Sequence, residues 1–215
     1  MIFKGLKRQQ AGLLGNAFIL IFASHAIPLW LEALTRGNAL QQAIGTENLV
    51  ACWFLSFSII LVAHDPVGYG LTFGDIRKQW KWVVPLCVIP LLGTWIVYPR
   101  LPVRPFTGDP IATWLISPLA QDLLFAGYLY RHFEKGFPGT ITRKLPFNRT
   151  IFVTAVYFSL WHSVGLLYGA GGFVYFQMVY TFFGACLMGA IRQYTGSFIY
   201  ITAVHIVANY IAVCY

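Results

Sequence analysis

The chain has 215 residues, of which 58% are hydrophobic, 17% aromatic and 10% charged, and its mean hydropathy is +0.65. A soluble domain carries roughly a quarter charged residues, so this composition excludes a water-soluble fold and predicts that lipid covers most of the surface. The net charge of +8 does not indicate a nucleic-acid partner, because the basic residues lie in short loops between apolar runs.

Seven apolar segments follow one another along the chain. They lie at residues 11–33, 44–64, 81–99, 111–132, 150–168, 172–191 and 196–214. Hydrocarbon offers no partner to an unpaired backbone group, so each segment is predicted to be a helix. We therefore expect an all-α polytopic membrane protein with about seven transmembrane helices, folded as one integral membrane domain over residues 1–215. The first segment is too long for a signal-peptide core and is predicted to stay as an uncleaved helix.

The basic residues predict the orientation of these helices. With the N-terminus in the cytoplasm, twelve of the fifteen Lys and Arg residues lie on the inner side, and Arg36, Arg100 and Arg104 lie on the outer side. This asymmetry follows the positive-inside rule and predicts an N-in, C-out topology. The expected location is integral to the membrane, in a bacterial inner (plasma) membrane, with the lipid bilayer as a partner.

The cysteines suggest no metal or redox chemistry. Cys52, Cys87, Cys186 and Cys214 all lie inside apolar runs, and none belongs to a CxxC pair. They are interpreted as small core residues, and we expect neither a cofactor nor a bound metal.

Polar residues within the last four segments, a core region at 111–214, are the candidates for a functional site. Asp122, next to Gln121, lies in the fourth segment and His162 in the fifth. His205 and Asn209 lie four residues apart, and so on one helix face, in the seventh. At 1.5 Å of rise per residue, four of these side chains are predicted to lie about 14–20 Å into the membrane, at one level. They are those of Asp122, His162, His205 and Asn209. Ionisable residues at such depth indicate function.

This set of side chains is typical of acyl hydrolysis. A carboxylate and an imidazole can hold and deprotonate a water, and a second imidazole with an amide can donate to a developing oxyanion. The alternative is structural, because buried His, Asn and Gln often bridge membrane helices. His25 and His64, near segment ends, are interpreted as packing or interfacial residues.

Three stretches on separate predicted helices resemble a known family. Residues 117–129 read SPLAQDLLFAGYL, residues 158–162 read FSLWH, and residues 205–209 read HIVAN. They resemble the motifs Glu-Glu-x-x-x-Arg, Phe-x-x-x-His and His-x-x-x-Asn of the CAAX-protease and bacteriocin-processing (abortive-infection) family of intramembrane proteases. The resemblance covers about residues 111–212 and implies an intramembrane endopeptidase of the glutamic type that needs no metal.

The first motif departs from the family pattern. Gln121 stands where the family has its first glutamate, Asp122 where it has the second, and Ala126 where it has the arginine. Because Gln121 cannot act as a base and can only orient a water, Asp122 is predicted to be the base. By resemblance, His162 assists in activating the water.

By the same resemblance, His205 and Asn209 form the oxyanion hole. The sequence therefore predicts an endopeptidase that cleaves a membrane-anchored peptide or protein substrate. An inactive relative, acting as a binding or immunity-type membrane protein, stays open as the alternative. A small transporter is disfavoured, because we find no internal repeat in the sequence.

Overall fold

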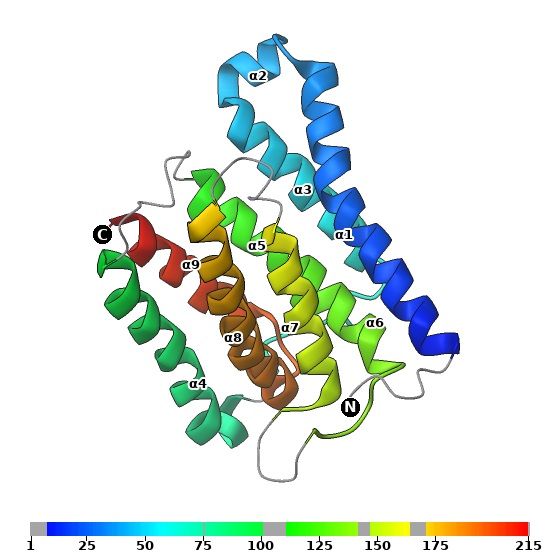
Figure 1. Ribbon diagram of the computed structural model, residues 1–215, viewed down its shortest axis with the longest axis vertical. Coiled ribbons are helices and arrows are strands. Elements are labelled where there is room, and N and C mark those ends of the chain that lie inside the picture. The colour runs from blue at the N-terminus through cyan, green and yellow to red at the C-terminus, as the bar shows by residue number, and fades with distance from the viewer. Residues whose placement is uncertain (1–7, 75, 101–110, 142–146, 164–170, 215) are drawn as a thin grey trace.

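The computed structural model describes residues 8–74, 76–100, 111–141, 147–163 and 171–214. These residues form helices joined by loops (Figure 1), and no β-strand occurs among them. Within the described ranges, three helical stretches are long and apolar enough to cross a membrane, and two apolar helices are shorter. The three are Arg8–Thr35, Gln79–Arg100 and Gly172–Thr195, and the shorter two are Thr46–Val62 and Ile199–Ala212. The predicted all-helical membrane fold is confirmed, and the seven spans and their orientation stay predictions.

The first helices form a hairpin that projects beyond the rest of the bundle (Figure 1). Its long arms are α1 (Arg8–Thr35) and α3 (Thr46–Val62), which pack on each other. The short α2 (Ala39–Ile44) lies at the tip, outside the predicted segments, and begins where the Asn38 side chain accepts a hydrogen bond from the backbone of Gln41 at 2.9 Å.

A second group of helices packs beside this hairpin (Figure 1). It contains α4 (Ile76–Val97), α7 (Arg149–Trp161), α8 (Gly171–Thr195) and α9 (Ile199–Cys214). α8 packs between α7 and α4, and α4 also contacts α9. The predicted segment 150–168 was too long, since α7 ends at Trp161; residues 164–168 lie outside the described part of the chain.

Between the two groups runs a continuous helical stretch, here called the central helix (residues 112–134). It consists of a π-helical turn at Ala112–Ile116, α5 (Ser117–Asp122), a second π-helical turn at Leu123–Leu129 and α6 (Tyr130–Glu134). Pro118 has no N–H and its ring crowds the preceding turn, which explains the widened turn before α5. α5 therefore lies between two widened turns, and it carries Gln121 and Asp122.

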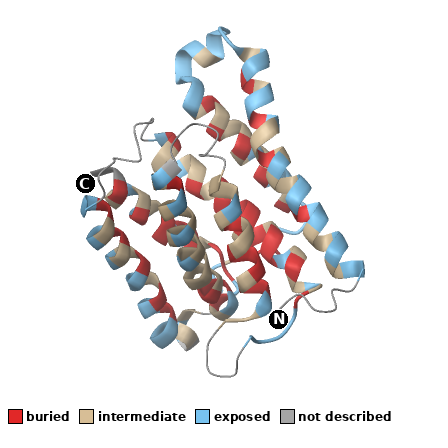
Figure 2. Cartoon of the chain, in the orientation of Figure 1, coloured by how far each residue is buried: buried red, intermediate tan, exposed pale blue. Residues whose placement is uncertain are grey.

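Burial follows the membrane pattern predicted from composition (Figure 2). The central helix is the most buried element, and Leu124 and Leu129 have no exposed surface. Large apolar side chains on the outer faces of the other helices are exposed, such as Phe22 at 69%, Ile60 at 73% and Phe183 at 63%. Exposing an apolar surface of this extent to water is unfavourable, so we infer that lipid covers it.

Candidate active site

A cavity of about 510 Å³ lies between the hairpin, the central helix and the second group of helices. Its wall includes residues of α1, α3, α4, α5, α7, α8 and α9, and most of them are apolar. The motif residues Gln121, His162, His205 and Asn209 all line it. The structure thus brings to one cavity four of the five residues that the sequence singled out.

Asp122 is the fifth residue, and it is placed differently. It does not line the large cavity, and it lies behind His205. His205 Nδ1 lies 3.2 Å from Asp122 Oδ1 and 3.3 Å from Oδ2, and both side chains are buried. This geometry joins α5 to α9 through a carboxylate–imidazole pair. Asp122 can therefore influence the cavity through the ring of His205, which lines it.

A small second cavity of about 30 Å³ adjoins Asp122. Ala126 and Tyr130 also line it. These residues follow Asp122 at intervals of four, so the small cavity runs along the same face of the central helix. This volume is enough for about one water molecule. It lies beside the position at which the resemblance places an arginine and this chain has Ala126.

His162 lies at the end of α7, where it is the C-cap residue. The sequence had placed it in the middle of a longer helix. Its Nδ1 donates to the carbonyl oxygen of Phe158 at 2.9 Å, which assigns the proton of the neutral ring to Nδ1. The other ring nitrogen, Nε2, then carries a lone pair. His162 can therefore offer a proton acceptor to the cavity that it lines.

Gln121 and Asn209 each keep part of their hydrogen-bonding capacity. Gln121 Nε2 donates to the Ser117 hydroxyl at 2.8 Å, and its buried Oε1 has no partner among the residues that the structure describes. Asn209 Nδ2 donates one hydrogen to the Thr113 carbonyl oxygen at 3.1 Å, and a primary amide carries a second hydrogen on that nitrogen. A buried amide oxygen without a partner is costly, so a water donating to Gln121 Oε1 would stabilise the site.

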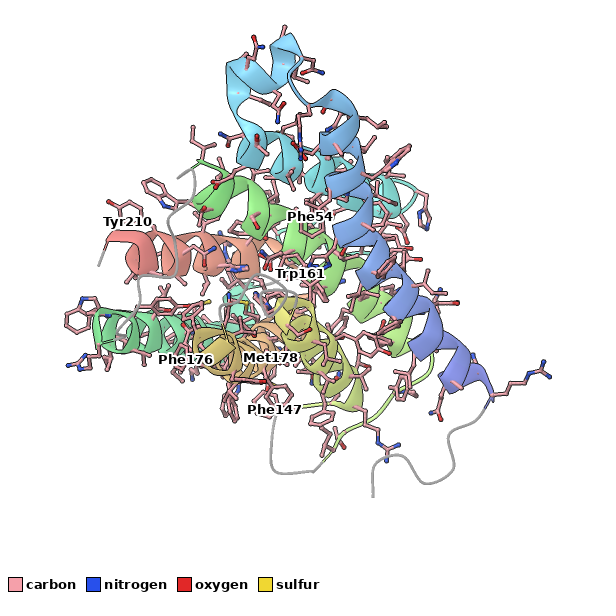
Figure 3. The ribbon with its side chains drawn as sticks, turned by 45° about the horizontal axis from the view of Figure 1, so that its top comes forward. Phe54, Phe147, Trp161, Phe176, Met178 and Tyr210 are labelled. Carbon is pink, nitrogen blue, oxygen red and sulfur yellow. The ribbon has the colours of Figure 1, made fainter. Side chains whose placement is uncertain are left out.

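The hairpin contributes cavity residues that the sequence analysis did not assign to the site. Ser24 and His25 of α1 and Phe54 of α3 line the cavity together with Trp161. Phe54 of the hairpin and Trp161 of α7 stack with their ring centroids 5.6 Å apart. Both are labelled in Figure 3. His25, which the sequence interpretation assigned a packing or interfacial role, packs on Trp161 and also lines the cavity. It lies ten residues before the end of α1 at Thr35.

Metal binding was also considered from the geometry. Among the residues that the structure describes, no group of three or more His, Cys, Asp or Glu side chains is arranged to hold a metal ion. The expectation that no metal takes part stays a prediction.

Apolar helices with a polar, motif-bearing cavity among them define an integral membrane protein with a buried reaction or binding site. The family model that matches the chain, over residues 104–211 or half of its length, is the Rce1-like family of type II CAAX prenyl endopeptidases. The chain belongs to this family. Neither a curated protein nor a solved structure gives a significant match.

Proposed function

We propose that this protein is an intramembrane endopeptidase of the CAAX type, which cleaves a peptide bond of a membrane-anchored peptide or protein. The convergence of His162, His205, Asn209 and Gln121 in one cavity carries this proposal. The apolar walls of that cavity suit a substrate that arrives from the lipid phase. Membership of the family supports the same activity.

In this mechanism, His162 and Gln121 together activate the attacking water. A water between them donates one hydrogen to Gln121 Oε1 and the other to His162 Nε2, the two acceptors described above. As the water oxygen bonds to the substrate carbonyl carbon, its proton passes to His162 Nε2. Gln121 orients the water and takes no proton.

His205 and Asn209 stabilise the oxyanion that forms on the carbonyl. His205 turns Nδ1 to Asp122, and with one hydrogen between Nδ1 and the carboxylate, a hydrogen on Nε2 can point to the cavity. The buried carboxylate orients the ring, as an Asp behind a catalytic histidine does. The second Nδ2 hydrogen of Asn209 is the other donor. Asp122 thus acts through His205. The departing amine must still take up a proton from the site.

One observation favours the alternative, a non-catalytic binding protein. The acid of the first motif is Gln121 in this chain, and Asp122 does not line the cavity. In that case the cavity would bind an apolar segment or lipid chain without hydrolysing it, and the polar side chains would give it specificity.

A direct assay separates the two functions. The purified protein is placed in lipid nanodiscs with a prenylated peptide that ends in a CAAX sequence, and products are followed by mass spectrometry. We expect cleavage by the wild type and none by His162→Asn, with both variants equally stable to heat. Saturable binding of the peptide without any cleavage by the wild type would establish the binding function instead.

The membrane topology is proposed with seven spans, N-in and C-out, in a bacterial inner membrane. The asymmetry of basic residues supports it. Reporter fusions after Lys135 are expected to be cytoplasmic and fusions after Tyr215 extracytoplasmic. A cytoplasmic reporter at Tyr215 would contradict the seven-span topology.

A further inference from the structure

A third imidazole lines the cavity besides those of His162 and His205, and it comes from outside the part of the chain that the family model matches. His25 lies on α1, whereas the match begins at residue 104. Its ring centroid lies 4.7 Å from that of Trp161, and the Trp161 centroid lies 5.1 Å from that of His162. The two imidazoles therefore pack against the same indole and line the same cavity.

The hydrogen bonds of His25 repeat those of His162. His25 Nδ1 bonds to the carbonyl oxygen of Ile21 at 3.0 Å, as His162 Nδ1 bonds to that of Phe158 at 2.9 Å. In both rings Nδ1 carries a hydrogen, and Nε2 is the nitrogen that can gain or lose a proton. Besides His205, the cavity is thus lined by His25 and His162, and in each of these two rings Nε2 is the nitrogen that can take up or release a proton.

Trp161 fixes the position of α1 relative to the end of α7. Its Nε1 donates to the hydroxyl of Ser24 at 3.1 Å, and Ser24 donates to the Ile21 carbonyl oxygen at 2.8 Å. Ser24 is 3% exposed, so this contact is shielded. Because Ser24 precedes His25 and Trp161 precedes His162, the same contact positions both rings.

The departing amine needs a proton, and the imidazoles that line the cavity can supply it. A carboxylic acid at position 121 could deprotonate the water and then protonate the leaving nitrogen, but the amide of Gln121 can do neither. We propose that His25 is the general acid of this site, protonating the amine that leaves when the peptide bond breaks. This inference rests on the proposed peptidase function.

His162 and His25 together account for every proton that moves in the reaction. The hydroxyl of the water stays on the carbonyl carbon, and its proton passes to His162 Nε2. As the carbon–nitrogen bond breaks, protonated His25 gives its Nε2 proton to the amine. The proton on His162 then returns to His25 through cavity water, which restores the starting state. Two imidazoles thereby share the work of base and acid.

A pair of substrates tests this role. Besides the prenylated peptide amide, the assay uses the same peptide with a thioester at the scissile bond, because a thiolate leaves without being protonated. His25→Asn keeps a donor for the Ile21 carbonyl oxygen and loses Nε2. We expect its kcat on the amide to fall about 100- to 10,000-fold, and its kcat on the thioester to stay within about threefold of wild type. His162→Asn should lose both reactions.

His132 provides the matched control. It is a histidine outside the cavity whose Nε2 bonds to the Leu13 carbonyl oxygen at 3.2 Å, so it also contacts α1 through a backbone carbonyl. His132→Asn should hydrolyse both substrates as the wild type does. His25→Gln serves as the second variant if His25→Asn proves unstable in a thermal unfolding measurement.

The outcomes separate this inference from the proposed function. A wild type that cleaves neither substrate overturns both. A wild type that cleaves, with stable His25 variants equally active on the amide or equally impaired on both substrates, overturns the role of His25 alone. As a second measurement, the loss in His25→Asn should shrink in a Gln121→Glu background, because the new carboxylic acid can protonate the amine. An undiminished loss there would contradict the proposed division of roles.

Discussion

The two halves of the molecule contribute to the cavity in different ways. The C-terminal half brings the motif residues, from α5, α7 and α9, into hydrogen-bonding positions around one space. The N-terminal half closes that space with α1 and α3 and carries none of the three motifs. It still places His25 and Ser24 in the cavity wall.

This difference shows which features of the site a sequence can predict. A motif gives the spacing of residues within one helix, and the three motifs together predict that their residues lie at one depth in the membrane. Contacts between helices far apart in the chain, such as Trp161 with Ser24, leave no periodic signal in either helix. Changes in the C-terminal half should therefore affect turnover first, and changes at the contacts between the halves should affect stability or positioning first.

The largest expected effect belongs to Asp122→Asn. The amide keeps the shape of the side chain but removes the negative charge behind His205, so the ring loses the carboxylate that orients it. Replacing the carboxylate behind a catalytic imidazole lowers kcat by about 10⁴-fold, and we expect a loss of about that size. Cleavage of the prenylated peptide is the measurement.

The control for Asp122→Asn is Glu134→Gln, which neutralises an acid outside the cavity, ion-paired with Arg131 at 2.7 Å. It should leave kcat at the wild-type value. Full activity in a stable Asp122→Asn variant would contradict the catalytic role of the carboxylate–imidazole pair.

Asn209→Ala should have the second largest effect. It removes the free Nδ2 hydrogen that we assign to the oxyanion, together with the bond to the Thr113 carbonyl oxygen. Loss of one oxyanion donor typically lowers kcat by about 10²- to 10³-fold, with a smaller change in KM. A variant that raised KM and left kcat unchanged would assign Asn209 to substrate binding.

The fold and the site were predictable to different extents. Each of the seven apolar segments overlaps a described helix, because burial in lipid demands long apolar runs, although the segment 150–168 runs past the end of α7 at Trp161. α2 was missed because six residues at a polar tip give no such run. The cavity placement of Gln121 and His162 followed from the motifs. The position of Asp122 behind His205 did not, since neighbouring residues on a helix point about 100° apart and the sequence does not say which one faces the cavity.

His25 could have been found by one signal. It is an ionisable residue inside an apolar run, which marks a candidate site in any membrane helix. It was interpreted as a packing or interfacial residue near the end of the segment 11–33, and α1 spans Arg8–Thr35. Its neighbours in space come from α7, and no spacing within α1 predicts them.

A third change tests the junction between the halves at the turn between α8 and α9. The buried Arg192 guanidinium donates to the carbonyl oxygens of Ala126 and Gly68, each at 3.3 Å, and also to that of Gly196. A Cβ at Gly70 would lie 2.5 Å from Arg192 Cζ. Gly70→Ala should therefore displace Arg192 and cost about 1.5–3 kcal/mol, the value of a hydrogen bond to a charged group.

Gly139→Ala is the matched control for this change. Gly139 has φ of +90° and Gly70 has φ of +98°, but a Cβ at Gly139 meets no atom of the described residues within 4 Å. The backbone strain is thus similar, and the difference between the two variants in thermal unfolding isolates the contact with Arg192. Equal losses would show that this contact does not stabilise the junction.

The smallest expected effect is that of Ser24→Ala, which removes the hydroxyl that Trp161 Nε1 donates to. Hydrogen bonds between membrane helices contribute about 0.6 kcal/mol on average, so the loss of stability should be near that value. A double-mutant cycle with Trp161→Phe, followed by unfolding in detergent micelles, measures the bond itself. A coupling energy near zero would mean that Trp161 holds α1 through ring packing alone. A coupling of about 0.6 kcal/mol, together with a kcat in Ser24→Ala that falls further below wild type on the amide than on the thioester, would mean that this hydrogen bond also positions His25 against the leaving group.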